Sequence, residues 1–200
     1  MRTGWIIFLV VFGLLFMGGC SAISWGVRTY NGMVTEQEGV GSQWSNVENV
    51  YQRRADLIPN LVETVKGYAA HEKGTFEAVI EARAKATQTT IDPTNLTPEK
   101  LAAFQGAQNG LSSALSKLMV VVEAYPELKA NENFMALQSQ LEGSENRIAV
   151  ERRKYNETAK VFNTHIKSFP ANLIAGFGNF TAKPYFEAEE GAEKAPQVKF

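Results

Sequence analysis

The 200-residue chain has one cysteine, Cys20, and only two histidines, His71 and His165. A single cysteine forms no intramolecular disulfide bond and cannot supply the several thiolates of a structural zinc site. His71 has no second histidine four residues further on, so the helical motif of zinc hydrolases is absent. We therefore expect no bound metal and no covalent cross-link, which leaves side-chain packing as the source of stability.

The chain also lacks an excess of charge, because 20 lysines and arginines are balanced by 21 aspartates and glutamates, for a net charge of -1. A chain without surplus positive charge has no general attraction to the phosphates of DNA or RNA. The sequence contains neither a glycine-rich phosphate loop with its lysine nor a nucleophile elbow. We expect no nucleic-acid partner, no cofactor and no enzymatic activity.

The N-terminus is the part of the chain with the clearest pattern. Residues 3–27 include no charged side chain, and residues 5–17 are almost continuously apolar. As an α-helix, residues 5–27 would extend roughly 34 Å, against roughly 30 Å for the hydrocarbon core of a bilayer. Trp5 and Trp25 stand near the two ends, where indole rings favour the membrane interface. Residues 1–28 are therefore predicted to anchor the protein in the cell membrane.

Two forms of this anchor are compatible with the sequence. In the first, the helix is retained as a single-pass signal anchor. In the second, Gly18-Gly19-Cys20 is a lipoprotein processing site and Cys20 carries the lipid, although Met17 stands where leucine is usual. A cleaved secretory signal peptide is a third interpretation. The uncharged run continues past Cys20 to Trp25, which favours the retained helix. Arg2 and Arg28 balance each other, so flanking charge does not fix the orientation, and the remainder is assigned to the extracytoplasmic side.

Beyond the anchor, apolar or small residues recur at steps of three and four from Tyr30 to Ile80, which is a helical period. If this helix continued to about Thr87, it would be roughly 85 Å long. Pro59 lies inside the pattern and predicts a kink near Ile58, because proline removes a backbone hydrogen bond. The threonine-rich residues 88–96 are predicted to form a loop.

Two further helices have clear start signals. Thr97 can cap a helix whose first position is Pro98, and this helix ends before Pro126. Asn131 can cap another helix, nearly forty residues long, that ends before Pro170. Short connections place consecutive helices antiparallel. Residues 29–169 are therefore predicted to form an elongated, antiparallel, all-α bundle of three to four helices, with coiled-coil-like packing and a long kinked first helix.

Residues 170–200 differ in composition from the bundle. They are predicted to be an irregular tail whose aromatic side chains either fold back on the bundle or bind a partner. The acidic residues would keep this end soluble. The aromatic residues are Phe177, Phe180, Tyr185 and Phe186, and the acidic residues are Glu187, Glu189, Glu190 and Glu193.

The long first helix and the last helix of the bundle each carry a polar band. If these two helices are antiparallel with Tyr30 beside Ile166, equal rise per residue places Tyr51 near Glu145, so that arginine and carboxylate groups pair across the bundle. The band then either sets the register of the helices or forms a recognition surface, and acid–base catalysis is a third use. Its members are Arg53, Arg54, Asp56, Asn60, Glu145, Asn146, Arg147, Arg152, Tyr155 and Asn156.

Residues 51–72 (YQRRADLIPNLVETVKGYAAHE) form a long and distinctive run that resembles the LemA family. Further matches occur at Tyr125-Pro126-Glu127-Leu128, Tyr155-Asn156 and Ser168-Phe169-Pro170, and the resemblance covers about residues 28–186. It implies a membrane-associated helical bundle, widespread in bacteria, for which no enzymatic activity is established. Relatives of this kind include proteins linked to specialised bacterial membrane compartments.

Together, these features predict a membrane-anchored, noncatalytic helical scaffold or interaction protein of the bacterial cell envelope. Its partners would be the lipid bilayer, envelope or membrane proteins, and other copies of the chain. The alternative is a small-ligand binder or an enzyme that uses the polar arginine and glutamate band between the long helices.

Overall fold

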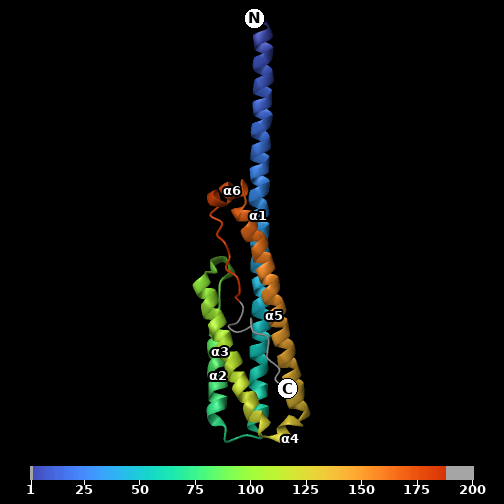
Figure 1. The fold of residues 1–200 in the computed structure, drawn as a ribbon, viewed down its shortest axis with the longest axis vertical. Coiled ribbons are helices and arrows are strands. Elements are labelled where there is room, and N and C mark those ends of the chain that lie inside the picture. Colours follow the sequence, from blue (N-terminus) through green and yellow to red (C-terminus); the bar gives the residue numbers. More distant parts are fainter. Residues whose placement is uncertain (1, 188–200) are drawn as a thin grey trace, which may run out of the picture. The chain divides into compact units, whose positions relative to one another are not determined.

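The computed structural model describes residues 2–187, without the side chains of residues 2, 3 and 94. Over this range the chain is helical and has no strand (Figure 1), which confirms the predicted all-α fold. Glu189, Glu190 and Glu193 of the predicted acidic tail lie outside the described residues. The elements are α1 (Arg2–Lys66), α2 (Lys73–Gln88), the 3-10 helix η1 (Pro93–Asn95), α3 (Pro98–Glu123), α4 (Pro126–Lys129), α5 (Glu132–Lys167) and α6 (Ala171–Phe177).

These helices contribute to two units, each with its own packing. Unit 1 holds the described residues up to Val40 together with Thr158–Lys183. Unit 2 holds Gly41–Glu157 together with the described residues from Pro184 onward. Both α1 and α5 contribute a segment to each unit.

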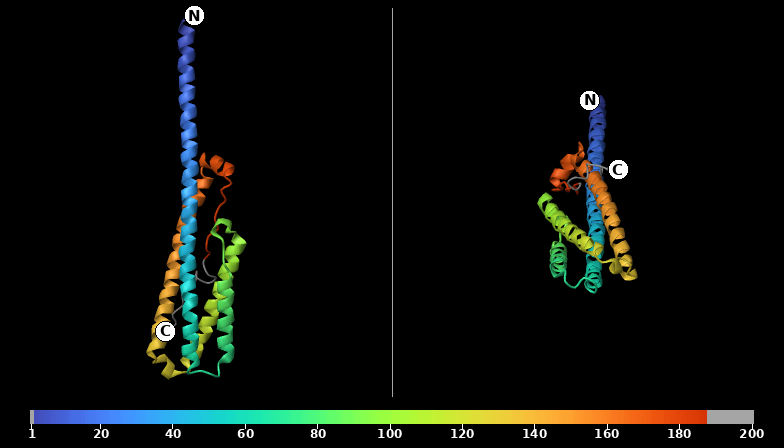
Figure 2. Two further views of the ribbon diagram at one scale, coloured as in Figure 1. Left: turned by 180° about the vertical axis from the view of Figure 1, so that it is seen from behind. Right: turned by 60° about the horizontal axis from the view of Figure 1, so that its bottom comes forward.

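Unit 2 is an antiparallel bundle of long helical segments from α1, α2, α3 and α5, and the short helix α4 precedes α5 (Figure 2). Every segment contributes buried side chains to one hydrophobic core, including Ile58, Val79, Leu118 and Phe134. Burial of a side chain of this size stabilises the fold by roughly 1.5 to 3 kcal/mol. The structure thus has the helical bundle that the apolar spacing predicts.

The helix α1 continues through Pro59 to Lys66, so the proline does not end the helix. Proline has no N–H, so the carbonyl of Ala55, four residues earlier, loses its helical donor. Arg83 of α2 replaces it, because its Nε donates to the Ala55 carbonyl oxygen at 2.8 Å. A side chain from the neighbouring helix therefore compensates for the proline, and the helix persists.

The helical period from Tyr30 to Ile80 does not form one helix, because α1 ends at Lys66 and residues 67–72 turn into α2. The N–H of Gly67, which follows the last helical residue, donates to the Glu63 carbonyl at 3.3 Å. The Ala69 N–H donates to the Val65 carbonyl at 2.9 Å, and Ala69 remains fully buried in the core. The apolar spacing continues across the turn, which explains why periodicity alone predicts a single helix.

Both predicted helix caps are present. The Thr97 hydroxyl accepts a hydrogen bond from the Lys100 N–H at 3.3 Å, and Asn131 Oδ1 accepts one from the Phe134 N–H at 3.0 Å. These contacts satisfy backbone donors that have no partner within the first turn. The last long helix, α5, ends at Lys167, before Pro170 as predicted.

The segment after Pro170 was predicted to be irregular, and this is wrong for its first part, which forms the short helix α6. Proline and two glycines, Gly176 and Gly178, flank or interrupt this stretch, which is why the sequence predicts no helix. Residues 178–187 have no helix or strand.

In unit 1, the first part of α1 carries exposed apolar side chains, such as Ile7, Phe12 and Leu15. Within residues 2–187, α1 is the helix that is long and apolar enough to cross a membrane, and that window has no buried residue. Further along, Glu36 of α1 contacts His165 Nδ1 of α5 at 2.9 Å. The two helices therefore begin to pack together only after the apolar run has ended.

Candidate functional site

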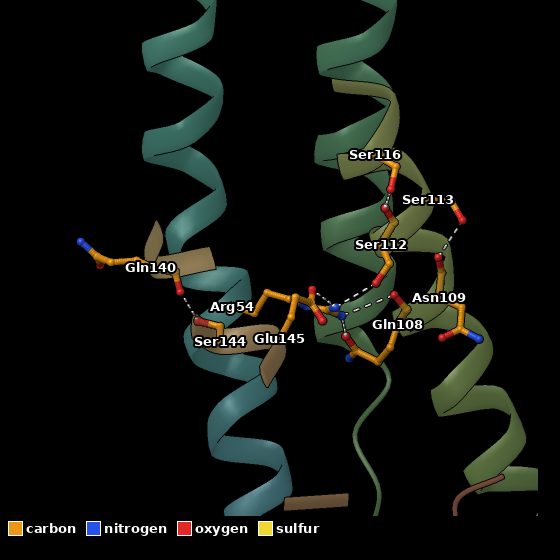
Figure 3. Close-up of polar contacts among 9 residues, drawn as sticks. All are labelled: Arg54, Gln108, Asn109, Ser112, Ser113, Ser116, Gln140, Ser144 and Glu145. Atoms are coloured by element: carbon orange, nitrogen blue, oxygen red, sulfur yellow. Dashed lines mark hydrogen bonds and ion pairs between the residues drawn. The ribbon is translucent and has the colours of Figure 1, made fainter. Parts of the chain in front are cut away.

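Two residues of the predicted polar band meet inside unit 2, since Arg54 Nη1 lies 2.7 Å from Glu145 Oε1 (Figure 3). The Arg54 side chain comes from α1 and is 2% exposed, whereas the Glu145 side chain, from α5, is 44% exposed. The pair thus consists of a fully buried cation and a carboxylate that still reaches water.

Arg54 also contacts α3, and through it α2. Its Nη1 donates to Ser112 Oγ at 2.9 Å, and its Nη2 donates to Gln108 Oε1 at 2.6 Å. Gln108 Nε2 donates in turn to the Ala86 carbonyl of α2 at 3.3 Å. The guanidinium carbon lies 5.2 Å from the centre of the Tyr51 ring, close enough for a cation–π contact. Arg54 therefore joins α1 directly to α3 and α5, and Gln108 extends this network to α2.

The position of this charge constrains the bundle. Removing a guanidinium from water costs several kcal/mol unless an opposite charge and hydrogen bonds replace its hydration. If α3 or α5 slid by one turn, Arg54 would lose these acceptors and remain buried. Arginine keeps its proton in proteins, so the group can hold a carboxylate or an anion but cannot act as a base.

The remaining predicted band residues do not share this cluster. Arg53, Asn60, Asn146 and Arg147 are exposed at the surface. Asp56 accepts a hydrogen bond from Gln52 Nε2 at 2.7 Å and lies 4.0 Å from Arg83. The band predicted from the sequence is therefore divided between a buried centre at Arg54 and an outer surface. Its three remaining residues lie further along α5.

Those three residues, Arg152, Tyr155 and Asn156, hold residues 184–187 against the helices of unit 2. Asn156 bonds both backbone groups of Phe186, accepting from its N–H at 2.8 Å and donating to its carbonyl at 2.9 Å. The Phe186 ring stacks on the Trp44 ring, with the two ring centres 5.8 Å apart. The Arg152 guanidinium carbon lies 5.0 Å from the centre of the Phe186 ring. Phe186 is thereby 6% exposed, so this aromatic residue of the tail folds back on the bundle.

Tyr155 completes the attachment of this segment, because its hydroxyl donates to the Pro184 carbonyl at 3.2 Å. Burial raises the pKa of Tyr155 above the usual 10.0, and the neighbouring Tyr185 adds to the effect. The phenol therefore stays protonated, and stays a donor, at pH values where an exposed tyrosine ionises.

An open groove of about 750 Å³, which the sequence does not predict, lies between α3 and α5. The signal in the sequence is a set of small polar residues on α3, Ser112, Ser113 and Ser116, between the buried leucines. Ser113 Oγ and Ser116 Oγ donate to carbonyls of their own helix, each at 3.0 Å, so both oxygens remain acceptors. The groove is lined by Asn109, Ser112, Ser113, Leu115, Ser116, Met119, Leu141, Glu142 and Glu145.

The chemical groups that the groove exposes are mainly oxygen acceptors. In the described part of the chain, no three histidine, cysteine or acidic side chains are grouped as metal ligands. The groove presents carboxylates and hydroxyl oxygens, which suit a partner that brings hydrogen-bond donors or positive charge.

Comparison with known proteins gives a consistent set of relatives. The family model described as "LemA family" matches residues 43–200. The magnetosome protein MamQ 2 of Paramagnetospirillum magneticum is 29% identical over 181 residues, covering 82% of this chain and 66% of the relative. MamQ of Magnetospirillum gryphiswaldense is 28% identical over 189 residues, covering 84% and 70%. Protein LemA of Metamycoplasma hominis is 24% identical over 183 residues, covering 92% and 79%. The chain thus spans about two thirds of the length of these magnetosome proteins.

The contact between Arg54 and Glu145 can be tested with a double-mutant cycle. We expect Glu145→Ala to lower the free energy of unfolding by about 2 kcal/mol in the parent chain, because it leaves a buried cation without its counter-charge. In an Arg54→Met background the same change should cost close to zero. Urea unfolding of the full-length protein in detergent, followed by circular dichroism, measures both. Asn146→Ala, at the adjacent exposed position, is the control, and equal costs in the two backgrounds would contradict the pairing.

Tyr155 predicts an alkaline loss of stability. Below pH 10 the phenol is protonated in the folded and unfolded states. Above pH 10 the tyrosine ionises in the unfolded state but keeps its proton in the folded state. Ionisation therefore stabilises the unfolded state, and the free energy of unfolding falls. We expect Tyr155→Phe to remove this component and to cost about 1 kcal/mol at neutral pH through the lost hydrogen bond. Urea midpoints between pH 8 and about pH 11 measure the difference, with Tyr68→Phe as control for loss of a phenol. Parallel pH profiles for the parent and Tyr155→Phe would contradict the prediction.

Proposed function

The chain belongs to the LemA family, and from this premise we propose that it is a membrane-anchored, noncatalytic helical scaffold or interaction protein of the cell envelope. It is a membrane-associated protein, and its relatives include magnetosome proteins. The proposal adds a single-pass anchor, a bundle on the extracytoplasmic side, and a protein partner. A lipoprotein signal, or a signal anchor whose N-terminus stays in the cytoplasm, translocates the chain that follows it, and the proposal takes this orientation.

The observation that supports this proposal most directly is the continuity of α1. The helix runs without interruption from Arg2 to Lys66. Its first part has exposed apolar side chains, and its later part contributes Trp44, Ile58 and Val65 to the buried core of unit 2. A helix that both crosses the bilayer and forms a core element of the bundle joins the two without a linker.

The continuity of α1 also favours a retained signal anchor over a lipid anchor. Gly18, Gly19 and Cys20 lie within the helix, and Cys20 is exposed. A lipoprotein peptidase would cut the helix before Cys20 and discard the most apolar part. In a retained anchor, by contrast, Cys20 is a small apolar side chain among lipid tails.

A noncatalytic role is supported by the way in which the buried charge is used. Arg54 bonds Glu145, Ser112 and Gln108 of its own chain, so the donors on its Nη1 and Nη2 atoms serve the bundle. Interaction would then fall to the groove between α3 and α5, where hydroxyl oxygens and the carboxylates of Glu142 and Glu145 are accessible.

The groove also favours the second candidate function, small-ligand binding, because its volume of about 750 Å³ is within the usual range for ligand sites. Such sites, however, are mostly apolar and enclose most of their ligand. An open groove lined by serines and glutamates fits a donor-rich polypeptide surface better.

The form of the anchor is tested by Cys20→Ser. We expect the variant to remain in the membrane fraction after alkaline extraction, with an intact N-terminus, because the helix itself holds it. Mass spectrometry of the purified full-length protein measures the N-terminus and any added lipid. A parent protein that starts at Cys20 with diacylglycerol attached, together with an unprocessed variant, would show that the protein is a lipoprotein.

The interaction role is tested by a photo-crosslinking residue at Ser113, an exposed position in the groove. We expect a discrete adduct in native membranes, with a protein partner or with a second copy of the chain. The same residue at Ala84, exposed on α2, is the matched control and should give none. Adding Ser116→Trp to fill the groove should abolish the adduct. No adduct at Ser113, or equal adducts at both positions, would count against the groove as an interaction surface.

A further inference from the structure

Helix α6 in unit 1 exposes its large apolar residues and buries its small ones. Leu173 is 56% exposed and Phe177 is 88% exposed, whereas Ala171 and Ala175 are 7% and 4% exposed. A helix on the surface of a water-soluble protein shows the opposite pattern, with its large apolar side chains toward the core. Phe169, just before this helix, is also 82% exposed. The outward face of α6 is therefore built for an apolar environment.

This helix packs on α1 at the point where the exposed apolar run ends (Figures 1 and 2). A Cβ placed on Gly26 would lie 3.6 Å from Ile174 Cδ1, so the two helices touch at this glycine. Next to the contact is an open groove of about 450 Å³, lined by Gly26, Val27, Tyr30, Ile174, Phe177 and Gly178. The exposed apolar surface of α1 thus continues onto α6.

The depth of this contact follows from the geometry of α1. From Trp5 to Gly26 the helix rises roughly 32 Å, close to the thickness of the hydrocarbon core. If Trp5 lies at one interface of the bilayer, Gly26 lies at the other, and so does the helix packed on it. Amphipathic helices that rest on membranes occupy this boundary between headgroups and acyl chains.

The distribution of charged residues also places α6 at the membrane interface. Residues 168–182 contain no charged side chain, as is also true of residues 3–27. Arg28 and Lys167 stand directly beside these two uncharged segments, and both are exposed. Exposed basic side chains at this level can reach the phosphates of the lipid headgroups. Apolar surface next to exposed basic groups is the pattern of a membrane interface.

We propose that Phe169 and the outward face of α6, with Leu173 and Phe177, form a second membrane-contact surface that inserts into the headgroup region of the bilayer crossed by α1. The occupant of this face is lipid, because the surface is continuous with the apolar span and falls at its end. The proposal rests on the membrane anchor of the proposed function and adds a second point of contact to it.

The test uses the full-length chain with Cys20→Ser, reconstituted in vesicles of phosphatidylcholine and phosphatidylglycerol. Single cysteines replace Phe177, Leu14 in the apolar span, or Val120, which is exposed on α3, and each carries the fluorophore NBD. Quenching is measured with lipids that bear a nitroxide near the headgroup or deep in the acyl chain, and with iodide present on both sides of the membrane.

We expect NBD at Phe177 to lose emission with the headgroup-level nitroxide and to be protected from iodide. NBD at Leu14 should be quenched by the deep nitroxide, and NBD at Val120 by iodide. Leu173→Cys should behave as Phe177→Cys does, so the result does not depend on one replaced side chain.

Quenching by iodide at Phe177, with Leu14 still in lipid, would overturn this proposal and leave the anchor intact. Protection of Phe177 from both quenchers would overturn it as well, since protein and not lipid would then cover the face. Loss of lipid quenching at Leu14 would show that the anchor itself fails, and the second contact would fail with it.

Discussion

A buried guanidinium needs acceptors from several directions at once, and this requirement on Arg54 is the constraint on which unit 2 depends. Glu145 of α5 supplies the charge, while Ser112 and Gln108 of α3 supply neutral acceptors. Hydrophobic contacts are non-directional and allow helices to slide, whereas a buried charge permits one register. The apolar core stabilises the bundle, and Arg54 selects which arrangement of the four helices is stabilised.

A second arginine, Arg83, links α2 to α1. Arg83 of α2 donates to the Ala55 carbonyl that Pro59 leaves without a helical partner. The proline thus creates an acceptor on α1 at the residue next to Arg54, and α2 is held where it can use that acceptor. Without a donor at this carbonyl, the buried side of α1 would carry an unsatisfied group, at a cost of about 1 to 3 kcal/mol. Pro59 of α1 and Arg83 of α2 therefore depend on each other, because one frees the carbonyl that the other bonds.

The sequence predicts those features that depend on local rules or on simple geometry. The caps at Thr97 and Asn131 follow from residue type, and the meeting of Arg54 with Glu145 follows from equal rise in antiparallel helices. The end of α1 at Lys66 could not be predicted, because the apolar spacing continues through Ala69. The helix α6 could not be predicted either, because Gly176 and Gly178 have low helix propensity and tertiary packing stabilises the helix. The attachment of Phe186 by Asn156 joins residues thirty positions apart in the chain, and no local pattern indicates such a contact. The groove was missed because its small serines resemble an ordinary helix surface.

The division of the polar band has a consequence for any partner. Glu145 and Ser112 each bond Arg54 on one side and line the groove on the other. A ligand that took the Glu145 carboxylate for itself would leave a buried cation without its counter-charge, and binding would have to offset that loss. A partner that adds donors to the free lone pairs of Glu145 and Ser112 has no such cost, because a carboxylate accepts several hydrogen bonds. For the proposed interaction role, the groove therefore favours a donor-rich surface that leaves the Arg54 contacts in place, because the counter-charge of Arg54 also lines the groove.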